Sequence, residues 1–286
     1  MVIGSALWLA AHLPGKTVAV LFWDSAVPGI RFHGWSVNAN QMALLLVAAP
    51  FLGLILLRNL GETASIGFRF GVVLAVATSV AAGWATASGA LRVAWSVSVP
   101  IMVGLLFFAA VQGDRQSRRD LASLLQVAVC AVPIWLLSRA VLRAPACVTL
   151  TSGFSLGSDI VQVGDIPVRL QLIRHGLEAW FQSPWFGLGP GAHSGVTAPN
   201  LAREAHSSLI DWLTNTGLVG GSALIALCGW IAWRLLRQRD WVMLSALAAF
   251  AAFAQAHHVL RHPLVWFFLV LAARWPESHS SRHRRR

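Results

Sequence analysis

Charged side chains are scarce in this chain. Only 12% of its 286 residues are Asp, Glu, Lys or Arg, whereas an ordinary soluble domain carries about 25%. Apolar residues make up 56% and gather in long runs, such as 42–57, 72–87 and 264–273, with few or no ionisable groups. A helix that crosses a bilayer needs roughly 20 such residues. The composition therefore excludes an ordinary soluble domain and predicts membrane-spanning helices.

Acidic residues are the rarer of the two charged classes. The chain has 11 Asp and Glu against 22 Lys and Arg, which gives a formal net charge of +11. A nucleic-acid-binding protein concentrates such charge on one soluble face. Here the arginines lie between apolar runs and at the C-terminal end, so membrane topology explains them and we expect no nucleic-acid partner.

Cysteine is also rare, and tyrosine is absent. Cys130 and Cys228 lie inside apolar runs and Cys147 in a connecting segment, which gives neither a disulfide framework nor a metal-ligand spacing. We expect no metal and no cofactor. The 14 tryptophans are typical of the aromatic belts at membrane interfaces.

The apolar runs predict an all-α fold, a polytopic membrane helix bundle of about eight transmembrane helices. The predicted spans are residues 3–23, 37–57, 69–87, 91–111, 121–142, 209–233, 241–258 and 263–275. Arginines cluster in alternate connections, which are cytoplasmic by the positive-inside rule. Both termini are then cytoplasmic, and one large loop is extracytoplasmic. The predicted division is 1–142 N-terminal helices, 143–208 extracytoplasmic catalytic loop, 209–275 C-terminal helices and 276–286 basic cytoplasmic tail.

The large loop contains an amphipathic pattern of its own. Leu170, Ile173, Leu177 and Phe181 recur at helical spacing, with polar residues between them. The pattern predicts a helix lying in the membrane interface.

Three motifs follow one another from this helix onward. Arg169 stands near its start, the turn Pro184-Trp-Phe-Gly187-Leu-Gly189 follows, and His206 precedes a span that continues Asn215-Thr-Gly217-Leu-Val-Gly220. Weaker similarities are the Asn-rich segment 34–43, Thr86-Ala-Ser88-Gly and the late His258-to-Pro263 segment. In this order the motifs resemble those of the O-antigen ligase and O-antigen polymerase (Wzy-type) family, including the related protein O-oligosaccharyltransferases.

The sequence departs from the family pattern at several positions. Ser207 stands where the family usually has asparagine, and Asn215 where it has glutamate. The arginine of the family's Thr-x-Ser-Arg segment falls on Gly89, and Arg92 on the same helical face is the nearest substitute. Family members also carry more spans before the Asn-rich segment, which leaves open a shortened or fragmentary relative.

The resemblance implies a glycosyltransferase in the bacterial inner membrane, multi-pass, with its active site facing the periplasm. The donor would be a glycan on a polyprenyl pyrophosphate, and the acceptor a hydroxyl of lipid A core, a glycan or a protein. Membrane lipids would be further partners. Arginine suits the leaving pyrophosphate because its planar fork binds phosphate oxygens. Histidine suits the acceptor because its pKa of about 6.5 fits a general base.

The resemblance implies a role for each of several residues of this chain. His206 and Arg169 are the predicted catalytic residues. The predicted donor-phosphate ligands are Arg169, Arg174, Arg92, Gly187 and Gly189. All of these ligands except Arg92 also have a simpler interpretation: a headgroup-binding arginine at 169, a pair with Glu178 at Arg174, and a turn that ends the amphipathic helix at the glycines.

Two other interpretations of the chain remain open. A transporter or flippase of lipid-linked glycan would place charges at mid-membrane on broken helices, whereas these spans are nearly free of charge. A non-catalytic truncated relative is the other. The cluster His257, His258, Arg261 and His262 would suit a metal only with carboxylates nearby, and the loop that carries it has none.

Overall fold

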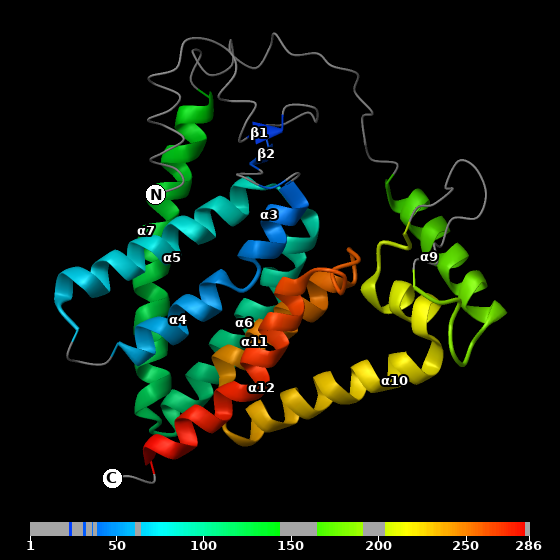
Figure 1. Ribbon diagram of the computed structural model, residues 1–286. Helices are drawn as coiled ribbons and strands as arrows, with labels where there is room; N and C mark the ends of the chain where they lie inside the picture. Colours follow the sequence, from blue (N-terminus) through cyan, green and yellow to red (C-terminus); the bar gives the residue numbers. More distant parts are fainter. Residues whose placement is uncertain are drawn as a thin grey trace. The chain divides into compact units, whose positions relative to one another are not determined.

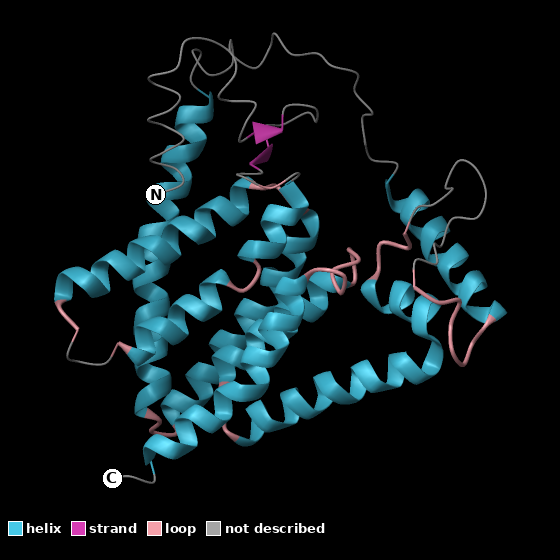
Figure 2. Cartoon of the chain, in the orientation of Figure 1, coloured by secondary structure: helices cyan, strands magenta, loops and turns pink. Residues whose placement is uncertain are grey.

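The computed structural model describes residues 23–24, 31–32, 36, 39–60, 64–143, 165–190 and 204–283. Its regular elements are helices, except for one pair of two-residue strands (Figures 1 and 2). The chain divides into two compact units, Met1–Val161 (unit 1) and Gln162–Arg286 (unit 2). The predicted all-α fold is confirmed for the described part of the chain.

Unit 1 is a bundle of apolar helices. Its described elements are β1 (Trp23–Asp24), β2 (Arg31–Phe32), α3 (Ala39–Leu46), α4 (Ala49–Asn59), α5 (Ile66–Ala85), α6 (Gly89–Val111) and α7 (Arg115–Arg143). Helix α5 packs mainly against α7 and also against α4 (Figure 1). Leu57 of α4, Val76 and Ala77 of α5, and Val127 and Ala131 of α7 are buried together in this contact.

The turn between α6 and α7 shows how the sequence limits a helix. Gly113 follows the end of α6 with a φ of +95°, a left-handed conformation that ends helices and favours glycine. Asp114 then accepts hydrogen bonds from the backbone N–H groups of Gln116 (3.2 Å) and Ser117 (3.1 Å) and so caps the start of α7.

The predicted span 37–57 is divided into α3 and α4. Pro50 stands in the first turn of α4, where it lacks an N–H group and its ring crowds the carbonyl of Leu46, which favours a break between the two helices. The indole of Trp95 on α6 donates to the carbonyl oxygen of Val47 at this break (3.0 Å). Residues 39–59 still form one apolar segment long enough to cross a bilayer.

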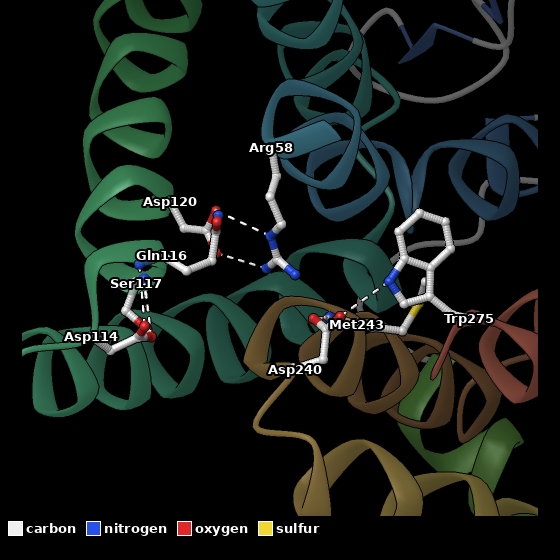
Figure 3. A network of polar contacts seen from close by, with 8 residues as sticks. All are labelled: Arg58, Asp114, Gln116, Ser117, Asp120, Asp240, Met243 and Trp275. Atoms are coloured by element: carbon white, nitrogen blue, oxygen red, sulfur yellow. Dashed lines mark hydrogen bonds and ion pairs between the residues drawn. The ribbon is translucent and has the colours of Figure 1, made fainter. Parts of the chain in front are cut away.

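A buried ion pair joins α4 to α7. The guanidinium of Arg58 donates to both carboxylate oxygens of Asp120, with Nη2 at 2.7 Å and Nε at 3.3 Å, as Figure 3 shows. The two side chains are only 11% and 3% exposed. Gln116 adds a third hydrogen bond to Asp120 at 2.9 Å. Both carboxylate oxygens of Asp120 therefore accept at least one hydrogen bond.

Unit 2 is organised around one long helix. Its described helices are α9 (Asp165–Gln182), α10 (Ser208–Arg237), α11 (Trp241–Ala254) and α12 (Pro263–His283), and α10 contacts each of the others. Asp240 begins α11 by accepting from the N–H of Met243 (3.2 Å), and its other oxygen accepts from the indole of Trp275 on α12 (3.1 Å) (Figure 3).

The described residues contain five helical segments long and apolar enough to cross a membrane. They are residues 39–59, 66–85, 89–111, 115–138 and 208–237. The predicted spans 241–258 and 263–275 are occupied by apolar helices that are shorter than this. Of the predicted span 3–23, the structure describes only Trp23, which belongs to β1. Helix α12 runs on to His283, so the region predicted as a tail from residue 276 begins in helix. The chain is a helical membrane protein.

Candidate functional site

The Pro-x-x-Gly-x-Gly turn fills a break in α10. Gly217 has non-helical angles (φ +64°, ψ −164°) in the middle of this helix. In an unbroken helix the N–H groups of Leu218 and Val219 would bind the carbonyls of Thr214 and Asn215. They bind the carbonyls of Pro184 (2.8 Å) and Trp185 (3.2 Å) instead, and the freed carbonyls of Thr214 and Asn215 accept from Leu188 (2.7 Å) and Gly189 (3.1 Å).

Two glycines make this exchange of hydrogen bonds possible. A Cβ atom at Gly187 would lie 2.5 Å from the main chain of Asn215 and Thr216, and one at Gly217 would overlap the main chain at Trp185. Both residues also have positive φ. The N–H groups of Gly187 and Gly189 already donate to the carbonyls of Ser183 (2.9 Å) and Asn215. The phosphate-binding role predicted for Gly187 and Gly189 therefore has no free N–H group to support it.

Helix α9 packs on α10 through small residues. Leu172, Gly176 and Ala179 share one buried face, and the hydroxyl of Thr214 on α10 donates to the carbonyl of Gly176 (3.2 Å). This face was not recognised in the sequence because it is short and contains a glycine. The predicted apolar face, with Leu170, Leu177 and Phe181, is exposed.

Arg174 projects from α9 on its polar side. Its Nε donates to the carboxylate of Glu178 one turn later at 2.8 Å, and the two side chains are 78% and 54% exposed. This is the local pair that the spacing allowed. Because both groups are open to solvent, the pair leaves the remaining guanidinium donors available to a ligand.

A cluster of ionisable residues forms where two segments of unit 2 meet. One segment, 204–208, leads into α10, and the other, 255–262, joins α11 to α12. The hydroxyl of Ser208 links them, because it donates to the carbonyl of His257 (2.6 Å) and accepts from the N–H of Val259 (2.8 Å). This link places Glu204, His206 and Asp211 beside His258, Arg261 and His262, and we call these six residues the polar cluster.

His258 lies between two carboxylates at the centre of the polar cluster. Its Nδ1 atom is 3.6 Å from Glu204 Oε1 and 3.9 Å from Asp211 Oδ2. The His258 and Asp211 side chains are 13% and 4% exposed. Asp211 Oδ1 accepts the backbone N–H of Ala205 (2.8 Å), which fixes the 204–208 segment over the first turn of α10. This arrangement places the imidazole of His258 between two carboxylate groups.

Charge and burial shift the pKa values of Glu204 and His262 in the polar cluster. The pKa of Glu204 is lowered, first by its interaction with the His258 imidazole and then by the positive charge of Arg261, with which it also forms an ion pair. Partial burial acts in the opposite direction and is outweighed. The pKa of His262 is lowered by burial and by the nearby Arg261. Glu204 therefore remains a carboxylate, and His262 remains neutral at neutral pH.

His206 stands at the exposed edge of the polar cluster. Its backbone has a φ of +55°, a conformation that few residues other than glycine adopt, and its side chain is accessible. Its positive charge, when present, contributes to the lowered pKa of Glu204. Ser207 takes the N-cap position of α10, but its hydroxyl caps no N–H group among the described residues, and Ser208 serves as the link described above.

The other predicted site residues are placed only in part. Arg169 belongs to α9 by its backbone, but its side chain lies outside the described residues. Arg92 is an exposed residue in the first turn of α6, in unit 1. Thr86 and Ser88, of the Thr-x-Ser segment, are buried in the turn before α6, where Thr86 donates to the carbonyl of Gly83 (2.7 Å).

Glu204 and Asp211 are functional candidates that the sequence analysis missed. The absence of carboxylates near His258 was inferred from its own loop, and the inference is wrong because another segment supplies two of them. The scarcity of acidic residues could have pointed to them. The chain has only 11, and two of these lie within 204–211, close to a histidine. Even so, within the described residues no group of three or more His, Cys, Asp or Glu is arranged to hold a metal ion.

No protein-family profile and no curated protein sequence matches this chain at a significant level.

Proposed function

We propose that this chain is a membrane glycosyltransferase that transfers or polymerises a glycan from a polyprenyl-pyrophosphate donor, of the O-antigen ligase or polymerase type. One observation supports this most: an exposed histidine, His206, lies near Glu204, one of the two carboxylates around His258, at the end of an apolar helix long enough to cross a bilayer. Such a site offers a base to a hydroxyl substrate next to a lipid-soluble donor. The motif order described above supplies the substrate class.

The chemistry needs one proton acceptor and one binding site for a leaving anion. The acceptor hydroxyl oxygen forms a bond to the anomeric carbon, the bond from that carbon to the phosphate oxygen breaks, and the polyprenyl pyrophosphate leaves. The hydroxyl proton goes to His206, the accessible imidazole. Glu204, Asp211 and His258 act as positioning residues, because they hold the 204–208 segment and set the electrostatic potential beside His206.

Arginines of α9 supply the positive charge for the leaving group in this proposal. Arg174 is exposed on the polar side of the helix, and Arg169 lies five residues before it. A guanidinium is charged at every physiological pH and binds phosphate oxygens through two N–H groups. Helix α9 is joined to α10 by the hydrogen bond to the Gly176 carbonyl and by those of the turn at 187–189. The arginines of α9 and the polar cluster at the start of α10 therefore belong to one connected part of unit 2.

The polar cluster is assigned to the non-cytoplasmic side by charge. It lies at the N-terminal end of α10, whereas Arg234 and Arg237 lie at the C-terminal end, with Arg239 just beyond. Arginine-rich connections are retained in the cytoplasm. The proposed location is therefore the bacterial inner membrane, with the site facing the periplasm, where lipid-linked glycans meet lipid A core, growing glycans or protein hydroxyls.

The test uses a bacterial host that lacks its own ligase or polymerase and carries the full chain, His206→Ala, Arg169→Ala or Arg119→Ala. Arg119 is an exposed arginine of α7, remote in sequence from the polar cluster, and serves as the control. We expect the wild type and the control to produce a ladder of surface glycan. We expect His206→Ala and Arg169→Ala to lose at least about 99% of it, typical for removal of a catalytic base or of a transition-state charge partner.

Equal ladders from all four proteins would contradict the proposal, provided that membrane fractions contain equal amounts of each. A flippase gives a different result. Lipid-linked glycan would then appear on the outer leaflet of vesicles without transfer to an acceptor, and purified protein would not consume donor.

A further inference from the structure

A row of exposed apolar side chains follows α9 into the turn. Four residues of this row are Phe181 (68% exposed), Trp185 (64%), Phe186 (75%) and Leu188 (45%). We call the last three, with their neighbours in 183–190, the aromatic turn. Large apolar side chains of this kind in a monomer mark a surface that meets another apolar phase.

The hydrogen bonds that attach the aromatic turn to α10 indicate that this apolar phase is the lipid bilayer. The carbonyls of Pro184 and Trp185 accept from Leu218 and Val219, which are themselves exposed apolar residues (39% and 52%) on the apolar part of α10. The turn is thus attached to a membrane-spanning helix at the point where that helix faces outward. Its side chains continue the apolar surface of the helix.

The backbone polar groups at the break in α10 have hydrogen-bond partners within the protein, as an environment without water requires. In a bilayer each unpaired N–H or C=O group costs several kcal/mol, so a broken helix is tolerated only where its freed groups find partners. Both N–H groups and both carbonyls released at Gly217 are bonded to the aromatic turn. An aqueous loop would have no need of this, because water would satisfy the same groups.

The length of α10 after its break indicates how deep the aromatic turn lies in the bilayer. From Leu218 to Trp233 the helix rises roughly 24 Å at about 1.5 Å per residue, close to the roughly 30 Å of a hydrocarbon core. At the far end, the guanidinium groups of Arg234 and Arg237 lie over the rings of Trp230 (5.0 Å) and Trp233 (4.7 Å), an arrangement typical of an interface. The aromatic turn therefore marks the opposite interface.

From these observations we propose that the aromatic turn is inserted in the bilayer, with Trp185 and Phe186 among the lipid chains just below the headgroups. The partner of this surface is the phospholipid bilayer itself. The inference is independent of the proposed enzymatic activity, because it rests only on exposure, hydrogen bonding and the length of α10.

The test places a nitroxide spin label at one cysteine in the full chain, after replacement of Cys130, Cys147 and Cys228 by alanine. Labels at Phe186→Cys and Phe181→Cys are compared with one at Gln182→Cys, an exposed polar position on the same helix as Phe181. The protein is reconstituted in vesicles of phosphatidylethanolamine and phosphatidylglycerol. Collision of the label with oxygen and with a water-soluble nickel chelate is measured.

We expect labels at 186 and 181 to collide several-fold more with oxygen than with the chelate, relative to the label at 182. If labels at 186 and 181 meet the chelate as readily as that at 182, the aromatic turn is in water and the proposal is wrong. The Phe181→Cys variant leaves the turn itself intact and reports on the same row of exposed apolar side chains, so the environment of this row is measured even if Phe186→Cys disturbs the fold. A chain that lacks activity but shows the expected collision pattern leaves this inference standing.

Discussion

The two units place ionisable residues among apolar helices in opposite ways. In unit 1, Arg58 and Asp120 form a closed pair: both are buried, and each carboxylate oxygen has a donor. In unit 2, the polar cluster is open, because His206 is accessible and Arg261 is 57% exposed, while His258 is held at 3.6 Å and 3.9 Å from two carboxylates. A closed pair joins helices, whereas an open cluster retains groups that a substrate can contact.

The largest effect is expected from the closed pair. Asp120→Asn leaves the Arg58 guanidinium buried without a counter-charge, which typically costs about 3 kcal/mol or more. We expect a clearly lower thermal unfolding temperature of the purified protein in detergent. Gln116→Ala, which removes only one neutral donor from Asp120, is the matched control and should cost about 1 kcal/mol. Equal unfolding temperatures for Asp120→Asn and wild type would show that the pair is not buried.

An intermediate effect, dependent on pH, is expected from the open cluster. The pKa of Glu204 is lowered in the folded protein, so its contribution to stability is complete above the ordinary pKa of 4.5 and is lost as pH falls through the lowered value. Glu204→Gln should therefore reduce the free energy of unfolding by about 1 to 2 kcal/mol at pH 7.

The measurement for Glu204 is a series of unfolding temperatures against pH. The difference between wild type and Glu204→Gln should shrink as pH falls below 4.5. A difference that stays constant across this range would mean that the carboxylate charge does not hold the two segments together. Glu178→Gln, an exposed carboxylate of α9, controls for the general loss of one negative charge.

The smallest effect on stability is expected at Arg174. Its pair with Glu178 is mostly exposed, and such pairs contribute less than about 0.5 kcal/mol. Arg174→Ala should leave the unfolding temperature unchanged. A loss of glycan transfer in this variant, seen mainly as a raised KM for the donor, would then report donor binding. Unchanged transfer would reduce Arg174 to a surface residue.

Most of the fold could be predicted because hydropathy depends on local sequence. The apolar runs located α5, α6, α7 and α10 to within a few residues at most boundaries, but α7 begins at Arg115, before the predicted residue 121, because charged residues can continue a helix outside the apolar run. Pro50 favours the division between α3 and α4, but proline alone does not predict a break, since Pro100 and Pro133 lie inside α6 and α7. The predicted span 241–258 is longer than α11, which ends at Ala254, because the prediction included the polar residues Gln255, His257 and His258.

The candidate site could be predicted only in part because its residues come from distant segments. His206 and the 257–262 histidines were each noticed, but their association depends on the Ser208 link to His257 and Val259, which no local pattern indicates. The two carboxylates near His258 were missed for the same reason. The role of Gly187 was interpreted as ligand binding, whereas the structure shows that its space is needed by the main chain at Asn215 and Thr216.

The interlocked glycines also limit how this sequence can diverge. The atoms that a side chain would strike at Gly187 and Gly217 belong to the main chain, which every amino acid carries. No second substitution nearby restores the space, so both positions require glycine. Trp185 and Phe186 need only remain apolar. Distant relatives are therefore best recognised by this couple of glycines on either side of a histidine, even after the aromatic residues have changed.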